Sequence, residues 1–495
     1  MASLIPKYTT AQIAALTTQA ISTLSTEDWA SFSTEQIAVL TTVQIPAIQT
    51  LGVRFLTSSA FGALDTNQIA ALTSSQAAAL TSVHASAINS AQLLALETSD
   101  IKVLSSTVIR ALSTAATAAL GSEDVQVMNT GQVAALSSTQ IASLQTGAIA
   151  ALNTANLRTL TTAQIAALNS ADAAAMNSTQ VAALSTSQLR VFDTANLAAL
   201  GTDQVAALSS AHAAVLKTDQ VAALTSAQVA VLNTSHAAAL NSVQVSVLDT
   251  AQAAAMSTSS IAAISTSGTR ALTTAALAAL STDQIAHLTS AQTGALGSAQ
   301  ANALSTSQAA ALESADLATM STAATRALTT AAMAALSTQQ ILAMTTTQAS
   351  ALSSDQIMAL NSAQVAALES TDLANLRSTQ VAVLNTAQAA AIETSDISAL
   401  STLNVRALST AAVNALTTDQ ITALNTAQAA ALTTSQTSAL QTAQIAALES
   451  RDFAVLSSAQ VAVLNSAQAA AIETCDISAL STLAVRAINS DAITG

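Results

Sequence analysis

The amino-acid sequence predicts an all-α solenoid built from short helix–turn units of eight residues, which we call octads. Counted from residue 1, the chain divides into 61 octads and seven further residues, with no insertion or deletion. The eighth position is apolar or aromatic in every octad, and the second is Ser or Thr in every octad except the first. The fourth position is Gln in 32 octads. A repeat that runs through the whole chain is itself the fold.

One short helix per octad fits this pattern better than one continuous helix. Eight residues of α-helix turn by about 800°, so the apolar row would drift by about 80° per octad around a continuous helix. A helix of about one and a half turns is unstable alone, so packing between octads must stabilise it. We expect the Ala residues at the sixth and seventh positions to allow close approach, and the apolar fifth and eighth positions to fill the core.

The start of each helix has two readings from the sequence. The Ser or Thr at the second position is one candidate for the N-cap. Alternatively, the first position is the N-cap. Ser/Thr-x-x-Gln then forms a capping box, and the apolar residues on either side form a hydrophobic staple. A β-solenoid with one short strand per octad is the alternative fold, although Ala and Gln are poor strand formers.

The few charged residues recur at regular intervals. Leaving out Arg158, which fits poorly, the arginines at the sixth position are separated by 7, 10, 10, 7, 10 and 10 octads. Glu/Asp pairs at the first and fourth positions recur from Glu313 onward at gaps of 7, 3, 7 and 3 octads. These spacings predict a superhelix with about 3.4 octads per coil, which places the charges on one side.

We interpret these charges as a ladder between coils or as a lateral contact, because isolated surface ion pairs stabilise a fold only weakly. The candidate residues are Arg54, Arg110, Arg190, Arg270, Arg326, Arg406, Arg486, Glu313, Asp316, Glu393, Asp396, Glu473 and Asp476.

Composition excludes several classes of function. The net charge is −14 and the 13 basic residues are dispersed, so the sequence predicts no nucleic-acid partner. Ser or Thr interrupts the apolar residues in every octad, so no membrane span is expected. The N-terminus lacks the features of a cleavable secretory signal. The protein is therefore expected either to remain in the cytoplasm or to leave the cell by a route other than Sec.

The sequence predicts no enzyme, no cofactor and no metal site. His84, His212 and His236 replace Gln at the fourth position and are interpreted as hydrogen-bonding substitutes. Cys475 stands where Ser395 stands ten octads earlier and is interpreted as a neutral replacement. The carboxylate pairs are more simply explained by solvated charges than by acid–base catalysis.

Residues 1–64 differ in composition from residues 65–495, which form the continuous repeat. The first segment holds most of the aromatic residues, so we predict an N-terminal cap or docking end, with Tyr8, Trp29 and Phe32 as candidates for an end-to-end contact. The last seven residues, NSDAITG, contain no cap signal. Two ends without a clear stop favour head-to-tail assembly.

The octads TTAQIAAL (161–168), STDQIAHL (281–288) and NTAQAAAL (425–432) resemble the long T-x-x-Q-I-A-A-L arrays of large secreted or surface proteins of proteobacteria. Some of those proteins carry adhesin or haem-utilisation labels. The resemblance implies a structural role at the cell surface. It transfers no catalytic or haem-binding residue.

The sequence therefore predicts a rod that binds other copies of itself head to tail and forms an extracellular or cell-surface filament. One alternative is an adhesin or an ice- or glycan-binding rod that uses its Ser/Thr face, with a surface glycan or matrix as its partner. Another is an intracellular scaffold filament.

Overall fold

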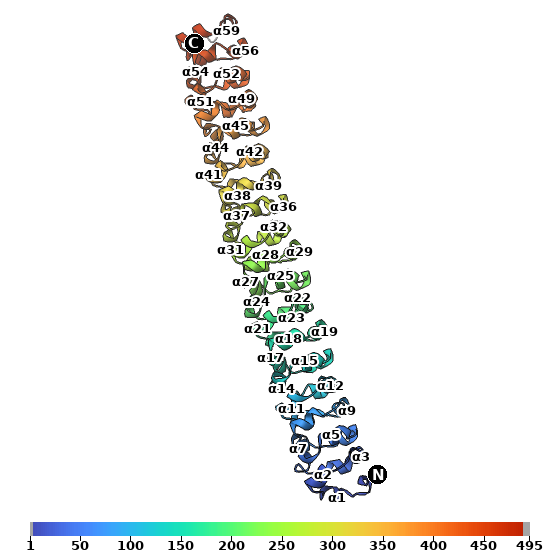
Figure 1. The fold of residues 1–495 in the computed structure, drawn as a ribbon. Helices are drawn as coiled ribbons and strands as arrows, with labels where there is room; N and C mark the ends of the chain where they lie inside the picture. The colour runs from blue at the N-terminus through green and yellow to red at the C-terminus, as the bar shows by residue number, and fades with distance from the viewer. Residues whose placement is uncertain (1–2, 489–495) are drawn as a thin grey trace. The chain divides into compact units, whose positions relative to one another are not determined.

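The computed structural model describes residues 3–488, in two units, Met1–Leu240 and Asn241–Gly495. Both units consist of short helices stacked in successive coils (Figure 1). The described residues contain 59 α-helices and two 3-10 helices, and no strand. The all-α prediction is confirmed and the β-solenoid alternative is wrong. The predicted lack of a cap in residues 489–495 lies outside the described residues.

Every α-helix begins at the second position of its octad and ends at the fifth, sixth or seventh. Unit 1 runs from the 3-10 helix η1 (Ile5–Lys7) to α28 (Thr234–Ala239). Unit 2 runs from α29 (Ser242–Val245) to α59 (Thr482–Ala487). None of the helices in the described range is long and apolar enough to span a membrane.

The first position of the octad is the N-cap, so the capping-box reading is confirmed and the second-position reading is wrong. Helix α44 (Ser362–Ala366) is representative. The Asn361 Oδ1 accepts from the backbone N–H of Gln364 at 2.9 Å, and the Gln364 Oε1 accepts from the backbone N–H of Asn361 at 2.8 Å. Two of the donors that a helix start leaves free are thereby satisfied.

Three positions of each octad form the interior. In the octad of α44, Gln364 and Val365 are 1% exposed and Leu368 is 3% exposed. Apolar residues at the fifth and eighth positions are buried in this way through most of the described chain. The fourth position is buried too, although it is usually a polar Gln. A buried amide is costly unless its hydrogen bonds are made, so its partners are the central question of this fold.

The buried Gln side chain connects successive coils. The Nε2 of Gln364 donates to the carbonyl of Leu336 at 2.7 Å and to that of Met333 at 3.1 Å. These acceptors lie 28 and 31 residues earlier, at the eighth and fifth positions of their octad. The last carbonyls of a short helix have no partner within the helix. Each Gln therefore supplies donors to the end of a helix in the preceding coil, and we call the repeated arrangement the glutamine ladder.

The hydroxyl at the second position makes contacts in the opposite direction. Ser90 donates to the carbonyl of Ala115 at 2.7 Å, 25 residues later. The hydrogen bonds of these two kinds thus span 25 to 31 residues, or 3.1 to 3.9 octads (25/8 and 31/8). Helix backbones pack mainly against the helix three octads away, as α44 does on α41 (Thr338–Leu342) and on α47 (Thr386–Ala390). The predicted 3.4 octads per coil lies within this interval.

Aromatic packing explains one position where the ladder is absent. Trp29 is 1% exposed and stacks on Phe32 with ring centroids 4.8 Å apart. Gly52 occupies the fourth position of an octad in the next coil, where a Cβ would lie 2.6 Å from the Trp29 Nε1. Only glycine fits at residue 52, because the indole fills the space that a side chain would need.

Replacing Gln364 by Leu should destabilise unit 2 by about 2–3 kcal/mol, because the buried Leu336 carbonyl and the Asn361 N–H lose their partners. Chemical denaturation measures the loss, and faster hydrogen exchange of the Asn361 amide locates it. Gln339→Leu, at an exposed third position, is the control and should change stability by less than about 0.5 kcal/mol. Equal effects of the two substitutions would contradict the role of the ladder.

Gly52→Gln restores the common residue but should destabilise unit 1 by about 1–3 kcal/mol, because the new side chain overlaps the Trp29 ring. The double variant Trp29→Ile/Gly52→Gln should recover most of this loss, since Ile69 and Gln92 have the same spacing elsewhere. A double-mutant cycle of unfolding free energies measures the coupling. Gly121→Ser, where the nearest atom to a new Cβ is 3.8 Å away, should be tolerated. Strictly additive effects would refute the overlap.

Candidate functional site

The buried side chains that can titrate or form several hydrogen bonds lie at the fourth position, where most octads have Gln. His84 reproduces both functions of Gln there. Its Nδ1 accepts from the backbone N–H of Thr81 at 3.2 Å, and its Nε2 lies 2.8 Å from the carbonyl of Leu56. An N–H can only donate and a carbonyl can only accept, so the ring is neutral with its hydrogen on Nε2. The predicted role as a hydrogen-bonding substitute is confirmed.

The other buried histidines have the same arrangement. The Nδ1 of His212 accepts from the Ser209 N–H at 3.1 Å, and its Nε2 lies 2.8 Å from the Leu184 carbonyl. The corresponding distances for His236, to Asn233 N and the Leu208 carbonyl, are 3.2 and 2.5 Å. Because both ring nitrogens are used, these side chains have no lone pair free for a metal ion in this conformation.

Asparagine at the fourth position preserves only half of the arrangement. The Nδ2 of Asn196 donates to the Leu168 carbonyl at 2.8 Å, 28 residues earlier, but its Oδ1 has no hydrogen-bond partner. Its side chain is one methylene shorter than that of Gln, so it makes the contact between coils but does not reach the N-cap amide. The length of Gln is therefore essential for the double contact.

Most aspartates at the fourth position are also buried. In the predicted charge pairs, Asp316, Asp396 and Asp476 are 4–5% exposed, whereas their partners Glu313, Glu393 and Glu473 are exposed at the N-cap. Each of these Asp carboxylates accepts from a serine 26 residues earlier, as Asp316 does from the Ser290 hydroxyl at 2.6 Å. The two acids of each pair thus have different roles, and only the Glu faces solvent.

In three further aspartates, burial destabilises the charged carboxylate. Burial raises the pKa of Asp100, Asp372 and Asp452 above the usual value. One carboxylate oxygen of each is buried without a hydrogen-bond partner. A carboxylate has no hydrogen to donate to the carbonyls that Gln would reach, which explains why the ladder is interrupted at these octads.

The candidate arginines of the charge pattern are exposed: Arg54, Arg110, Arg190, Arg270, Arg326, Arg406 and Arg486. Between residues 3 and 488 the one ion pair joins Arg451 and Glu449, which are both solvent-exposed, at 2.7 Å. The arginines of the pattern therefore form no ladder of ion pairs between coils in the described residues. Their role in a lateral contact stays a prediction.

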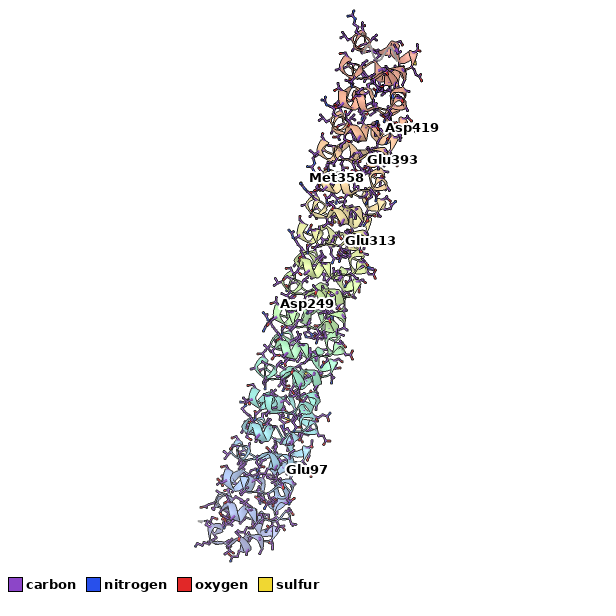
Figure 2. The ribbon with its side chains drawn as sticks, turned by 180° about the vertical axis from the view of Figure 1, so that it is seen from behind. Glu97, Asp249, Glu313, Met358, Glu393 and Asp419 are labelled. Atoms are coloured by element: carbon purple, nitrogen blue, oxygen red, sulfur yellow. The ribbon has the colours of Figure 1, made fainter. Side chains whose placement is uncertain are left out.

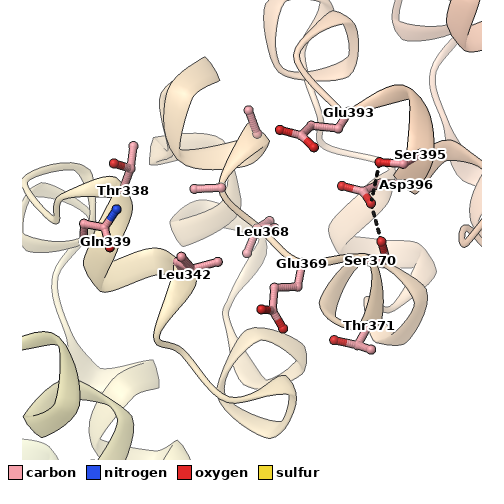
Figure 3. A pocket seen from close by; sticks show the side chains of 12 residues that line it. Thr338, Gln339, Leu342, Leu368, Glu369, Ser370, Thr371, Glu393, Ser395 and Asp396 are labelled. Carbon is pink, nitrogen blue, oxygen red and sulfur yellow. Dashed lines mark hydrogen bonds between the residues drawn. The ribbon is translucent and has the colours of Figure 1, made fainter.

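An open hollow of about 650 Å³ lies on the acidic side of unit 2, beside α45 (Ser370–Asn375) and α48 (Thr394–Ile397) (Figure 3). Its lining includes the carboxylates of Glu369, Glu393 and Asp396. Both hydrogen bonds that the Asp396 carboxylate accepts, from the Ser370 and Ser395 hydroxyls, go to Oδ1. Within the described residues, Oδ2 has no hydrogen bond. The hollow is therefore suited to a cationic group.

The structure brings together one cluster that the sequence interpretation missed. Ligand atoms of Glu473, Cys475 and Asp476 lie within 4.8 Å of one another. The Cys475 Sγ lies 3.7 Å from a carboxylate oxygen of each neighbour, as the Ser395 hydroxyl lies close to Asp396 in the equivalent octad. The spacing E-x-C-D contains this signal, because the first, third and fourth positions lie in one helical turn.

The aromatic residues predicted at an end contact have different environments. Trp29 and Phe32 are buried inside unit 1, where they pack against each other. Tyr8 is 37% exposed and lines a hollow of about 690 Å³ at the first coil. The hollow has an apolar part, Leu4, Ile5 and Leu24, and a polar part, Ser25, Glu27 and Asp28. Of the three candidates, Tyr8 is the one available for a contact, which itself stays a prediction.

The Ser/Thr face is not entirely free. Ser298 and Ser354 each donate to a backbone carbonyl 25 residues later at 3.2 Å, in the same way as Ser90. Part of the hydroxyl row therefore holds coils together. A role of the remaining hydroxyls in binding ice or a glycan stays a prediction.

Acid should destabilise unit 1 through His84. Burial lowers the pKa of His84 below its usual 6.5, while the bond to the Leu56 carbonyl acts in the opposite direction. Above about pH 6.5 neither state is protonated. Below it the unfolded state takes up a proton that the folded state resists, so stability falls until the folded pKa is passed. The unfolding free energy of wild type should therefore decline below about pH 6.5 more steeply than that of His84→Gln. His287→Gln, at an exposed position, is the control and should match wild type. Parallel pH profiles of wild type and His84→Gln would contradict this assignment.

Comparison with known proteins agrees with this geometry. No curated protein matches the chain. The ALTTAQ repeat family matches residues 45–82, 86–129, 118–154, 149–186, 174–210, 261–298, 309–346, 389–426 and 445–471. These segments cover more than half of the chain, and the family name repeats the Leu–Thr–Thr–Ala–Gln order that joins one helix end to the next capping box. The chain therefore belongs to the ALTTAQ repeat family.

Proposed function

We propose that this chain is a structural protein without catalytic activity, and that it assembles end to end into a filament outside the cell or on its surface. The positions of the polar and titratable side chains support this proposal. Histidine, asparagine and most aspartates at the fourth position are buried and serve contacts between coils. We therefore infer that partners bind to the exposed surfaces of the protein.

The last described coil carries the observation on which the proposal rests. Ile397 and Val405 are 0% and 1% exposed inside unit 2, whereas their equivalents ten octads later, Ile477 and Val485, are 43% and 42% exposed. The interior residues are covered by the following coil. At Ile477 and Val485 no later coil within residues 3–488 covers the same apolar surface, and a coil of the same type fits it.

The first coil has the complementary surface. The Oε1 of Gln12 accepts from the backbone N–H of Thr9 at 2.8 Å, but its Nε2 has no acceptor within residues 3–488. By contrast, the Nε2 of Gln36 donates to the Ile5 carbonyl at 2.8 Å. Gln12 is thus a ladder donor whose acceptor does not lie within residues 3–488. The hollow beside Tyr8 belongs to the same first coil.

In this proposal a second copy supplies the contacts that the first and last described coils do not find within residues 3–488. Its first coil would cover the open apolar surface at Ile477 and Val485, and its Gln12 would donate to the carbonyls there. The two surfaces are different, so the contact is heterologous and repeats without closing, which yields a filament. The same two kinds of surface meet between successive coils inside each unit.

The resemblance to arrays in secreted and surface proteins of proteobacteria favours a location outside the cell, reached by a route other than Sec. An intracellular scaffold filament would use the same end contacts. Fractionation of cells into surface and cytosol separates these two locations. An adhesive role would add a ligand to the filament without changing its assembly.

The double variant Ile477→Glu/Val485→Glu should abolish end-to-end assembly, because a buried unpaired carboxylate is strongly unfavourable at an apolar contact. Both residues are more than 40% exposed, so the fold itself should tolerate the change. Electron microscopy and sedimentation velocity at about 0.5 M NaCl, where weak ionic contacts are screened, measure filament length. Leu403→Glu, at a 68% exposed position of an interior coil, should assemble as wild type does.

Substitution at the other end should have the same effect, with Tyr8→Glu shortening the filaments of wild type. A wild-type chain that sediments as a single copy at every concentration would refute the proposal. So would filaments that the double variant leaves unchanged.

A further inference from the structure

Three arginines of unit 2 form a regular row. Arg326, Arg406 and Arg486 lie ten octads apart, on α39 (Thr322–Ala327), α49 (Thr402–Ala407) and α59. All three are exposed, and none pairs with a carboxylate within residues 3–488. Ten octads equal three coils of about 27 residues, inside the 25–31 residues that contacts between coils span. The three arginines therefore recur on one edge.

A row of glutamates has the same period. Glu313, Glu393 and Glu473 each precede one of these arginines by thirteen residues. This interval is close to half of a coil of 25–31 residues, so each Glu lies on the side of the coil opposite its Arg. This separation explains why no ion pair forms between them.

The figures show the two edges. In Figure 1, α39, α49 and α59 are labelled along the right edge of unit 2. Figure 2 gives the view from behind and shows Glu313 and Glu393 along its right edge, which is the left edge in Figure 1. We call these the arginine edge and the glutamate edge.

The glutamate edge has a place for a cation. Glu393 lines the hollow of about 650 Å³ together with Glu369 and Asp396 (Figure 3). Asp396 is 5% exposed and its Oδ2 accepts no hydrogen bond from residues 3–488. A guanidinium group donates several hydrogen bonds in one plane and suits a group of carboxylates. Arg406 of the same chain lies half a coil from Glu393, on the opposite side, so the cation must come from elsewhere.

We propose that the arginine edge of one copy binds the glutamate edge of a second copy lying parallel beside it. Because Glu and Arg have the same ten-octad period, a sideways shift without rotation brings three pairs together at once. Each Arg then lies half a coil further along the stack than the Glu of the other copy that it binds. This offset is about 4–5 Å for coils stacked 8–10 Å apart, and the long Arg side chain can span it. The contact is heterologous and leaves one free edge of each kind, so it extends into a sheet of parallel chains. It is separate from the end-to-end contact and does not depend on it.

Overall charge opposes this association. The net charge of −14 makes the chains repel one another. At about 0.15 M salt the screening length is about 8 Å, so the dispersed charge is largely screened while charges in contact still attract. Each exposed pair is weak alone, and the three pairs act together because they are held on one scaffold. Association should therefore be strongest at moderate ionic strength and lost at about 1 M.

Two charge-reversal variants test the proposal. One is Glu313→Arg/Glu393→Arg/Glu473→Arg, and the other is Arg326→Glu/Arg406→Glu/Arg486→Glu. Both are made in the Ile477→Glu/Val485→Glu background, where end-to-end assembly is removed. At about 0.15 M NaCl the background chain should form side-by-side assemblies by sedimentation velocity and electron microscopy. Each variant alone should remain a single copy, because its two edges carry like charges. An equimolar mixture of the two should associate again.

Asp203→Arg/Asp219→Arg/Asp355→Arg is the matched control, because it changes the net charge as much as the glutamate variant at exposed third positions away from the glutamate edge. It should associate as the background chain does. Arg377 and Lys217 already occupy N-cap positions, so arginine is tolerated where the glutamates stand, and circular dichroism checks the fold. The proposal is overturned if the background chain stays single at every salt concentration. It is also overturned if the glutamate variant behaves like the control, or if the mixture fails to associate.

Discussion

The rest of this structure depends on one buried side chain, the glutamine at the fourth position. A helix of four to six residues leaves most of its terminal N–H and C=O groups without partners and is unstable alone. Gln364 meets both needs, since its oxygen closes the start of its own helix and its nitrogen binds carbonyls in the coil before. Each such bond contributes about 1 kcal/mol net, but leaving the buried groups unpaired would cost more. The ladder therefore links local capping to tertiary stacking.

The natural substitutions at the fourth position show which properties of Gln matter. Histidine preserves both contacts, as at His84, because its ring nitrogens are spaced like the amide atoms. Asparagine keeps only the contact between coils, as at Asn196. Aspartate accepts but cannot donate, and at Asp100 one oxygen is left buried without a partner. At residue 52 the fourth position is glycine, because the Trp29 indole fills the space that a side chain would need. The fold tolerates each exception because neighbouring octads keep their own contacts.

In this architecture the side chains that hold the coils together and the side chains that face solvent occupy different positions of the octad. Polar chemistry at the fourth position is directed inward and is used for stacking. Charges at the first and sixth positions remain outside, and the repeat places them at fixed heights and angles. A solenoid of this kind therefore behaves as a scaffold on which surface residues are spaced by the coil. We accordingly propose that its function lies in those exposed surfaces.

Much of the fold could be predicted from the sequence alone. The eight-residue period, the apolar fifth and eighth positions and the recurrence of charges determine a short helix per octad and between three and four octads per coil. These properties are local or periodic, so they are visible without coordinates. The choice of N-cap was not, because Ser or Thr at both the first and second positions fits a helix start. The tertiary structure decided it, since the second hydroxyl lies where it can reach the next coil, as Ser90 does.

The candidate site, too, could be predicted only in part from the sequence. Sequence spacing identified Glu393, Asp396 and Arg406 as one repeated pattern, but it could not assign them to inside or outside. The coil geometry decides this, because position four points into the stack while positions one and six face solvent. It also places Trp29 in the interior, against Gly52 of the following coil. The sequence by itself thus determined the repeating unit and its period. Only the tertiary structure decided which polar groups meet, because those meetings span 25 to 31 residues and depend on how one coil lies on the next.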